Sequence, residues 1–192
     1  MELKNIAKIQ SGYISRGKID SRDDGTCLLL QAKDVAADHL SYRADALVRF
    51  MPRQSGKDWF IKPGDILFMA RGARNFSILI DTLPDNVLAA ACFFVVRISN
   101  SKILPEYLWW YLNQSLVEEY LKRFSGRAVH MPVVRRAVLE NIDIPLPPIE
   151  IQKQVSDLML LMQREQDLYK KLAEKRKSLM TGICLKSILK SR

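Results

Sequence analysis

Several short loops of this sequence carry basic and amide side chains, which are suited to binding a polar or anionic ligand. Arg71, Arg74 and Asn75 lie close together in a glycine-containing segment that follows an apolar run. A guanidinium group binds phosphate oxygens and forms paired hydrogen bonds with the edge of guanine. These loops therefore favour contact with nucleic acid, although a solvated surface charge is the alternative for each residue. The candidate contact residues are Arg16, Lys18, Arg22, Arg71, Arg74, Asn75, Arg127, His130, Arg135 and Arg136.

The sequence lacks the common signatures of catalysis and of metal binding. It contains no Gly-x-Gly-x-x-Gly segment and no phosphate loop that ends in Gly-Lys-Ser/Thr. Its two histidines, His39 and His130, are too few and too scattered for a histidine-rich metal site. Pro84-Asp85 is not followed by the Glu-x-Lys of a nuclease centre. We therefore expect a non-catalytic chain with no metal and no cofactor of its own.

The charge of the chain favours a polyanionic partner. The formal net charge of the 192 residues is +9. Residues 150–192 hold ten Lys and Arg against five Asp and Glu, so the excess is not confined to a basic tail. A basic surface attracts nucleic acid first and an anionic membrane second. Solubility alone is the simpler explanation of the same charge.

The sequence predicts a cytoplasmic protein. No apolar run approaches the roughly 18 residues of a membrane span, and the first seven residues lack the apolar stretch of a signal peptide. The three cysteines, Cys27, Cys92 and Cys184, are an odd number at wide spacing. This usage is typical of a reducing compartment, so we expect no disulfides and no membrane association.

Short apolar runs between turn residues predict a first half that is rich in strands. Lys62-Pro63-Gly64-Asp65 places proline and glycine at the positions that a tight turn requires. Leu3, Ile6 and Ala7 share one helical face, which predicts a short helix ending at Ser11-Gly12. The expected strands are residues 27–30, 44–50, 66–69, 76–80 and 87–97, the last as one central strand.

The spacing of apolar residues changes to a helical period after residue 100. It predicts one helix that begins at Pro105 and continues to Phe124, with Gly126 as its stop, and a short helix from Pro132 to Leu139. The predicted fold class is α+β, a mostly antiparallel sheet with packed helices, followed by a long coiled-coil-type helix. The globular domain would span residues 1–148 and the long helix residues 149–192.

A proline-rich stretch, Ile144-Pro145-Leu146-Pro147-Pro148, separates these two parts. After it, alternate steps of four and three residues meet ten positions, of which only Glu165 and Arg176 are not apolar or aromatic. A seam that repeats every 3.5 residues predicts packing against a partner helix, and the alternative is a helix folded back on its own domain. The partner-facing residues would be Ile151, Val155, Leu158, Met162, Tyr169, Leu172, Leu179 and Ile183.

The order of these motifs resembles the specificity subunit of type I restriction–modification systems. The likeness covers essentially the whole chain. It is strongest in the proline-rich stretch with the Ile149-Glu150-Ile151-Gln152 that follows it. The other residues that carry it are Leu3-Lys4-Asn5-Ile6-Ala7 with Gly12, Gly64-Asp65-Ile66-Leu67-Phe68 with Arg71-Gly72, and Pro105-Glu106-Tyr107-Leu108 with Tyr111-Leu112-Asn113.

The resemblance implies a subunit that reads double-stranded DNA without catalysing a reaction. It would hold adenine methyltransferase subunits, which bind S-adenosylmethionine, and a translocase–nuclease subunit would join them. In the family that this chain resembles, one subunit contains two recognition domains. Each domain is followed by a long helix, and the two helices pack antiparallel. This chain resembles half of such a subunit, so we expect a homodimer, formed through the long helix, that reads an inverted-repeat DNA site.

Two other functions fit the same sequence. The chain would be a recognition domain cut from a single-chain restriction–methyltransferase fusion if a catalytic domain preceded it in the reading frame. It would be a coiled-coil adaptor or regulator if its helices paired but it never bound DNA.

Overall fold

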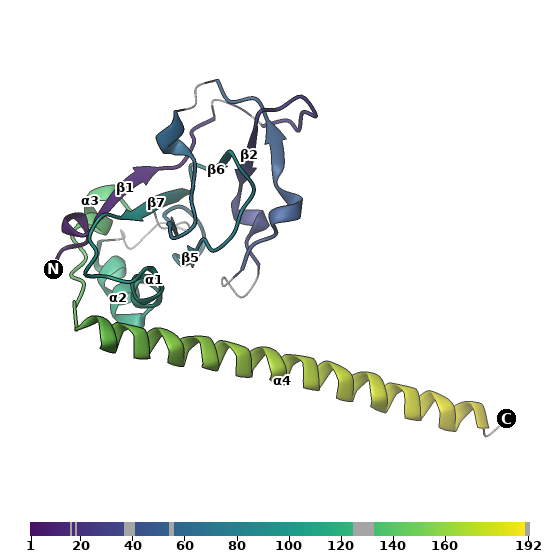
Figure 1. Cartoon of the computed structure of the whole chain (residues 1–192). Coiled ribbons are helices and arrows are strands. Elements are labelled where there is room, and N and C mark those ends of the chain that lie inside the picture. Colours follow the sequence, from purple (N-terminus) through teal and green to yellow (C-terminus); the bar gives the residue numbers. More distant parts are fainter. Residues whose placement is uncertain (16, 18, 37–40, 54–55, 125–132, 191–192) are drawn as a thin grey trace. The chain divides into compact units, whose positions relative to one another are not determined.

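The computed structural model describes all residues except 16, 18, 37–40, 54–55, 125–132 and 191–192. The chain forms two compact units, Met1–Gln152 and Lys153–Arg192 (Figure 1). The first unit contains every described strand and the three shorter α-helices, and the second consists of most of one long helix.

A four-stranded sheet has the order β1-β7-β4-β5, and each neighbouring pair is antiparallel. Val96 on β7 is paired with Ile9 on one side and with Ile66 on the other, which makes β7 an inner strand. Continuous apolar runs form β4 and most of β7 because both faces of these inner strands are covered. The strands are β1 (Ala7–Ser11), β4 (Ile66–Met69), β5 (Ser77–Leu79) and β7 (Phe93–Ile98).

A second sheet has the order β3-β2-β6, in which β2 pairs antiparallel with β3 and parallel with β6. Its strands are β2 (Cys27–Leu30), β3 (Val48–Phe50) and β6 (Val87–Ala89). Short 3-10 turns connect these elements: η1 (Leu3–Asn5), η2 (Ala32–Asp34), η3 (Ala44–Ala46) and η4 (Lys57–Trp59). The fold class predicted from the sequence is confirmed, with the strands divided between two sheets.

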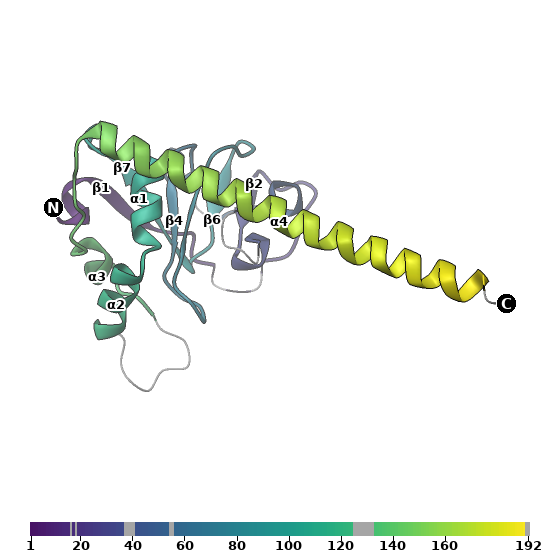
Figure 2. The ribbon, with the colours of Figure 1, turned by 90° about the horizontal axis from the view of Figure 1, so that it is seen from below.

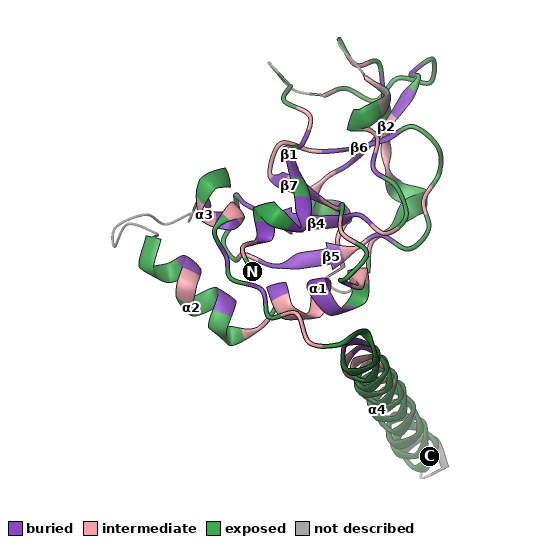
Figure 3. Cartoon of the chain, turned by 60° about the vertical axis from the view of Figure 1, so that its left-hand side comes forward, coloured by how far each residue is buried: buried purple, intermediate pink, exposed green. Residues whose placement is uncertain are grey.

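The apolar core lies where both sheets contribute side chains. Leu30 of β2 and Val87 of β6 belong to the same buried cluster as Leu67 of β4 and Val95 of β7. Figure 3 shows these strands coloured largely as buried. Removal of this apolar surface from water is the main force that joins the two sheets into one unit.

The first predicted helix is wrong, because residues 7–11 form strand β1. Ala7 and Ile9 are buried while Lys8 is exposed, so the side chains alternate with the period of a strand. Beyond β1, an ideal Cβ on Gly12 would lie 2.1 Å from the Ala90 carbonyl oxygen, so only glycine allows the backbones to approach this closely. Tyr13 forms an isolated parallel bridge with Ala90 there.

Two predicted strands also need correction. Residues 44–46 form η3, and only Val48–Phe50 of that segment is a strand. The apolar run 87–97 is divided into β6 and β7, which belong to different sheets. The Phe93 amide donates to the Ala90 carbonyl at 3.0 Å, so a turn at residues 90–93 carries the chain from one sheet to the other. By contrast, the predicted turn at Lys62–Asp65 is confirmed, and Gly64 has a φ of +88°.

The helix predicted from Pro105 to Phe124 is two helices, α1 (Pro105–Leu112) and α2 (Ser115–Phe124). The break falls at Asn113, whose side chain bonds to the backbone of β5. The next helix, α3 (Arg136–Glu140), is shorter than the predicted one, whose first residue, Pro132, lies outside the described residues. Near it, the Leu3 amide donates to Ile142 and the Ile144 amide donates to Met1, both at 2.9 Å, so the segment after α3 pairs with the first residues.

The last helix, α4 (Ile149–Lys190), is continuous over 42 residues and begins directly after the prolines, as predicted (Figure 2). Most of its residues are exposed (Figure 3). The seam residue Val155 is partly buried, and the other seam residues are exposed by 45 to 63%. Among the described residues, the seam is therefore an exposed apolar face.

Candidate nucleic-acid interface

The segment between β4 and β5 presents two of the predicted arginines. Arg71 and Arg74 are exposed, and neither forms an ion pair with any residue in the described part of the chain. The Asn75 side chain instead donates to the Met69 carbonyl at 2.8 Å, where it closes the loop. The loop therefore offers two guanidinium groups, while the amide group of Asn75 supports its shape.

Two ionisable groups lie close enough to these arginines for their pKa values to be affected by the arginine charges. Lys122 lowers the pKa of Glu118 on α2 through a hydrogen bond and its charge, and Arg74 adds a smaller effect of the same sign. Burial raises the pKa of the Cys92 thiol, and the charge of Arg71 partly opposes that rise. Arg74 is thus near an acid that already has a lysine partner, and Arg71 is near a neutral thiol.

Backbone pairing joins this loop to the segment that leads into α3. The Val134 amide donates to the Ala70 carbonyl at 2.9 Å, and Arg71 forms an antiparallel bridge with Val133. Arg135 and Arg136 follow directly, so the predicted residues of two distant sequence segments lie on adjoining backbone. Arg127 and His130 lie outside the described residues.

Two of the predicted arginines are already held by carboxylates. Arg22 donates through Nε and Nη2 to Asp24, both at 3.0 Å. Arg136 donates through Nε to Glu140 at 2.7 Å. Because each pair is exposed, the carboxylate weakens the local positive potential without fixing the arginine firmly. Arg16 and Lys18, which precede Arg22, lie outside the described residues.

A hollow of about 870 Å³ brings Arg22 and Arg136 to the same surface. Its aromatic side chains come from the segment after β1, from β3 and from η4, and its arginines come from two loops and from the first residue of α3. The lining includes Tyr13, Phe50, Trp59, Arg22, Arg53 and Arg136, with Asp20 as an acidic member.

Sequence reasoning missed Arg53 and Trp59 in this hollow. The Arg53 amide donates to the Tyr13 hydroxyl oxygen at 3.2 Å, which anchors its backbone, and its side chain forms no ion pair with the described residues. Trp59 is 46% exposed. A guanidinium without an ion-pair partner can bind phosphate, and an exposed indole in the same hollow can pack against sugar or base. The position of Trp59 next to a polar turn was the sequence signal that could have identified it as a candidate contact residue. Only the structure shows that its side chain is exposed.

The described residues were also compared with the requirements of a metal site and of a membrane span. No three His, Cys, Asp or Glu side chains gather there as metal ligands. No described helix has the length and apolar character that crossing a membrane demands.

Comparison with known proteins decides which family this arrangement represents. Residues 1–175 match the family described as the type I restriction modification DNA specificity domain. The chain belongs to this family. Two curated relatives come from Methanocaldococcus jannaschii. One, named as a putative type I restriction enzyme MjaX specificity subunit, is 28% identical over 50% of this chain and 23% of its own length. The MjaVIII specificity subunit is 25% identical over 62% of this chain and 26% of its own length.

Solved structures share the fold of this specificity domain. The HsdS subunit from Thermoanaerobacter tengcongensis aligns with a TM-score of 0.58 and 20% identity, over 85% of this chain and 36% of that chain. A chain from a type I restriction–modification complex aligns with a TM-score of 0.61 and 18% identity, over 85% of this chain and 37% of that chain. The specificity domain thus spans well under half of these longer chains.

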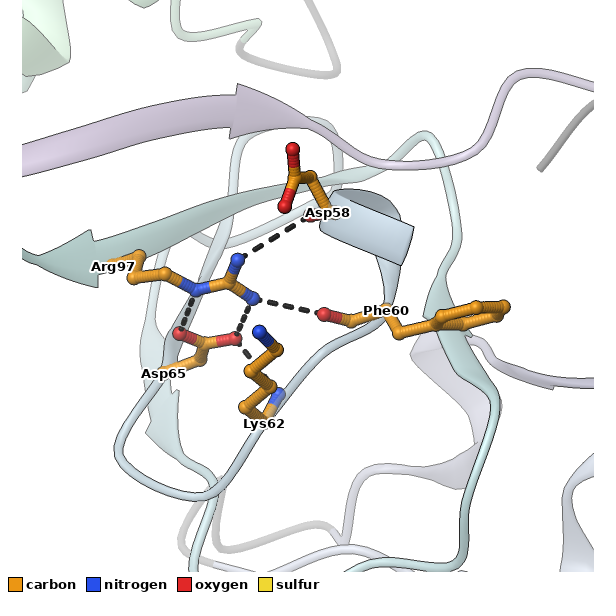
Figure 4. Close-up of polar contacts among 5 residues, drawn as sticks. All are labelled: Asp58, Phe60, Lys62, Asp65 and Arg97. Carbon is orange, nitrogen blue, oxygen red and sulfur yellow. Dashed lines mark hydrogen bonds and ion pairs between the residues drawn. The ribbon is translucent and has the colours of Figure 1, made fainter. Parts of the chain in front are cut away.

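The Gly-Asp motif of the specificity domain has a structural role. Asp65, with 3% of its side chain exposed, accepts hydrogen bonds from Arg97 Nε at 2.8 Å and Nη2 at 2.6 Å (Figure 4). Arg97 also donates to the Phe60 carbonyl at 2.8 Å, and the Lys62 amide donates to Asp65 at 2.8 Å. The carboxylate raises the pKa of Arg97 by its hydrogen bonds and its charge. The pair holds the turn before β4 against β7.

Two further motif residues of the specificity domain, Asn113 and Gln152, form side-chain hydrogen bonds with the backbone of other segments. Asn113 accepts a hydrogen bond from the Ser77 amide at 2.9 Å and donates to the Ser77 carbonyl at 3.0 Å, as a neighbouring strand would do for edge strand β5. Gln152 is fully buried. It accepts from the Leu104 amide at 2.9 Å and donates to the Lys102 and Pro147 carbonyls at 2.8 Å each. These motif residues therefore shape the domain.

Proposed function

We propose that this chain is the DNA-reading, non-catalytic component of a type I restriction–modification assembly. The observation that carries the proposal is the family match over residues 1–175, which includes both the globular unit and most of α4. The formal net charge of +9 supports it, because contacts to phosphates supply much of the affinity of a DNA-binding protein.

The proposed contact surface runs from Arg71 and Arg74, across the segment before α3, to the hollow that contains Arg53 and Trp59. Unpaired arginines support this choice, because they lose no ion pair when they bind phosphate. Paired arginines such as Arg22 would contribute less. Arg16, Lys18, Arg127 and His130 stay sequence-based candidates for the same surface.

The partners in this proposal are double-stranded DNA, an adenine methyltransferase subunit and a translocase–nuclease subunit. S-adenosylmethionine would bind to the methyltransferase and not to this chain. The assembly would act in the cytoplasm, where its DNA target lies. The exposed apolar seam of α4 supports a homodimer, and two-fold symmetry would then make the target an inverted repeat with a spacer.

Selection of binding sites from a random duplex library tests this function directly. The intact chain should enrich two half-sites in inverted orientation, and its affinity should fall steeply as salt is raised. Enriched sites without an inverted repeat would contradict the symmetric dimer while retaining DNA recognition. Failure to enrich any sequence, together with stable helix pairing, would instead favour a coiled-coil adaptor.

A further inference from the structure

Three large apolar side chains that line the hollow are exposed to solvent. Ile14 is 70% exposed, Met51 43% and Trp59 46%. They come from the segment after β1, from the residue that follows β3 and from the last residue of η4. Large apolar side chains that gather in one hollow, rather than lying singly on the surface, mark a contact site. A ligand of this hollow must therefore present apolar atoms of its own.

The fold holds these side chains in place through their sequence neighbours. The amide of Tyr13, which precedes Ile14, donates to the Ala89 carbonyl at 2.7 Å. The Tyr13 ring packs edge-on against the ring of Phe50, with 5.2 Å between the two centroids. Phe50 is buried in β3 and directly precedes Met51. The apolar side chains are thus carried on anchored backbone, which a site that discriminates between ligands requires.

The charges of the hollow favour a nucleic acid as its ligand. The charged lining residues in the described part of the chain are Arg22, Arg53, Arg136 and Asp20. Arg53 is exposed and has no ion pair with a described residue. A purely apolar ligand would cover these guanidinium groups without supplying a counter-charge, which is unfavourable. A DNA duplex supplies phosphates as well, so it satisfies both kinds of side chain.

Thymine methyl groups are the apolar feature that the grooves of an intact duplex expose. In the major groove, roughly 12 Å wide, each thymine presents its C5-methyl group beside the hydrogen-bonding edges of the bases. The minor groove is only about 6 Å wide and shows no methyl group, so a cluster of three large side chains fits the wider groove. The faces of the bases are also apolar, but they become accessible only when stacking is broken, which is energetically costly.

We propose that Ile14, Met51 and Trp59 recognise thymine methyl groups in the major groove, and that Arg53 binds a phosphate at the same site. This inference rests on DNA recognition in the proposed function and adds a base preference to it. At least one A·T pair then lies at a fixed place in the recognised sequence. Contact with a methyl group needs no hydrogen-bonding group in the protein, so apolar side chains alone carry this part of the specificity.

Removal of single methyl groups from the DNA tests the proposal with the unchanged, full-length chain. The duplex selected from a random library is remade with deoxyuridine in place of one thymine at a time, which removes the C5-methyl group and keeps the base pairing. At one or more positions the dissociation constant should rise about fourfold, the effect expected for the loss of one buried methyl group. Fluorescence anisotropy at a fixed salt concentration measures these constants.

Variants of the apolar side chains connect this effect to the hollow. Ile14→Ala, Met51→Ala and Trp59→Ala should weaken binding to the thymine duplex, and at least one of them should give the thymine and deoxyuridine duplexes equal affinity. Leu116→Ala is the matched control, because Leu116 is 66% exposed on α2 and does not line the hollow. This control should keep the fourfold difference. Circular dichroism checks that each variant is folded.

Arg53→Gln separates the phosphate contact from the methyl contact. The variant should weaken binding to both duplexes by the same factor and lower the salt slope by about one, because it removes a charge and no contact with a methyl group. Loss of the thymine preference in this variant would overturn the separate roles of Arg53 and the apolar side chains.

The remaining outcomes distinguish this inference from the proposed function. If no thymine is sensitive to deoxyuridine while the chain still enriches a sequence, thymine recognition is overturned and the proposed function stands. Methyl sensitivity that persists in all three alanine variants would overturn the assignment to the hollow. A chain that enriches no DNA refutes the proposed function and the thymine contact with it. In that case, alanine variants that lose binding to a methyltransferase subunit would identify the hollow as a protein-docking site.

Discussion

The arginines of the specificity domain differ in what surrounds their guanidinium groups. Arg97 is held by a nearly buried carboxylate and by backbone carbonyls, which makes it part of the framework. Arg22 has an exposed carboxylate partner. Arg53 and Arg71 have no carboxylate partner in the described part of the chain. Residue type alone therefore does not separate arginines of the framework from those left available for a ligand, whereas burial and pairing do.

The ion pair between Asp65 and Arg97 should be essential for the stability of the fold. Asp65→Ala leaves a partly buried guanidinium without its carboxylate, so the free energy of unfolding should fall by about 3 kcal/mol. Asp24→Ala removes the exposed partner of Arg22 and should cost less than about 1 kcal/mol. Urea unfolding of the two variants measures both values. Equal losses would contradict the framework role of Asp65.

Tyr42 should make stability depend on pH in the alkaline range. Burial, and then the hydrogen bond and charge of Asp81, raise the pKa of Tyr42 to about 12 from an ordinary value of 10.0. The native state thus keeps a proton that the unfolded chain loses above pH 10, so stability falls as the pH rises from 10 towards 12. Tyr42→Phe should make the melting temperature less steeply dependent on pH over this range. An identical slope in both proteins would refute this assignment.

At the scale of elements, the sequence predicts those segments whose signal is local. The Lys62–Asp65 turn, β2, β4 and the start of α4 depend on nearby prolines, glycines and apolar runs, and the structure confirms them. Division of 87–97 between two sheets was not predictable, because both parts are apolar and the turn at Ala90 is determined by contact with Gly12. The helix break at Asn113 depends on a hydrogen bond to Ser77, 36 residues away.

The residues of the candidate site also divide into those with a local sequence signal and those that depend on contacts between distant segments. The exposed loop that holds Arg71 and Arg74 was predictable, because a basic glycine-containing segment after a strand is visible in the sequence, and the contact of these arginines with DNA stays a prediction. The hollow was not predictable, because its lining comes from residues as distant as Tyr13 and Arg136. Asn75 was a reasonable candidate by residue type, but its side chain bonds to Met69 inside the loop.

The junction between the globular unit and α4 should depend on Gln152. Gln152→Ala removes a fully buried amide and leaves the Leu104 amide and the Lys102 and Pro147 carbonyls without these bonds, so unfolding should become easier by about 2–3 kcal/mol. Gln154→Ala, on an exposed position of the same helix, is the matched control and should change stability by less than about 0.5 kcal/mol. Thermal unfolding of both variants compares them.

At the scale of the whole molecule, the net charge of +9 should appear as salt-dependent DNA affinity. The double variant Arg71→Ala/Arg74→Ala should weaken binding to all sequences and lower the salt slope by about two, one for each lost phosphate contact. Arg22→Ala removes the same charge from a site already paired with Asp24 and should lower the slope by less. Fluorescence anisotropy at several salt concentrations provides the slopes. A larger effect of Arg22→Ala would contradict the choice of unpaired arginines.

The pairing of the first residues with late segments also determines the order in which the domain forms. During synthesis, β1 has no partner strand until residue 98 has left the ribosome, and Leu3 has no acceptor until Ile142 has followed. Contacts between such distant segments form slowly. The edge of β1 therefore stays open until β7 has been made, and the segment that precedes α4 is the last to pair with the first residues.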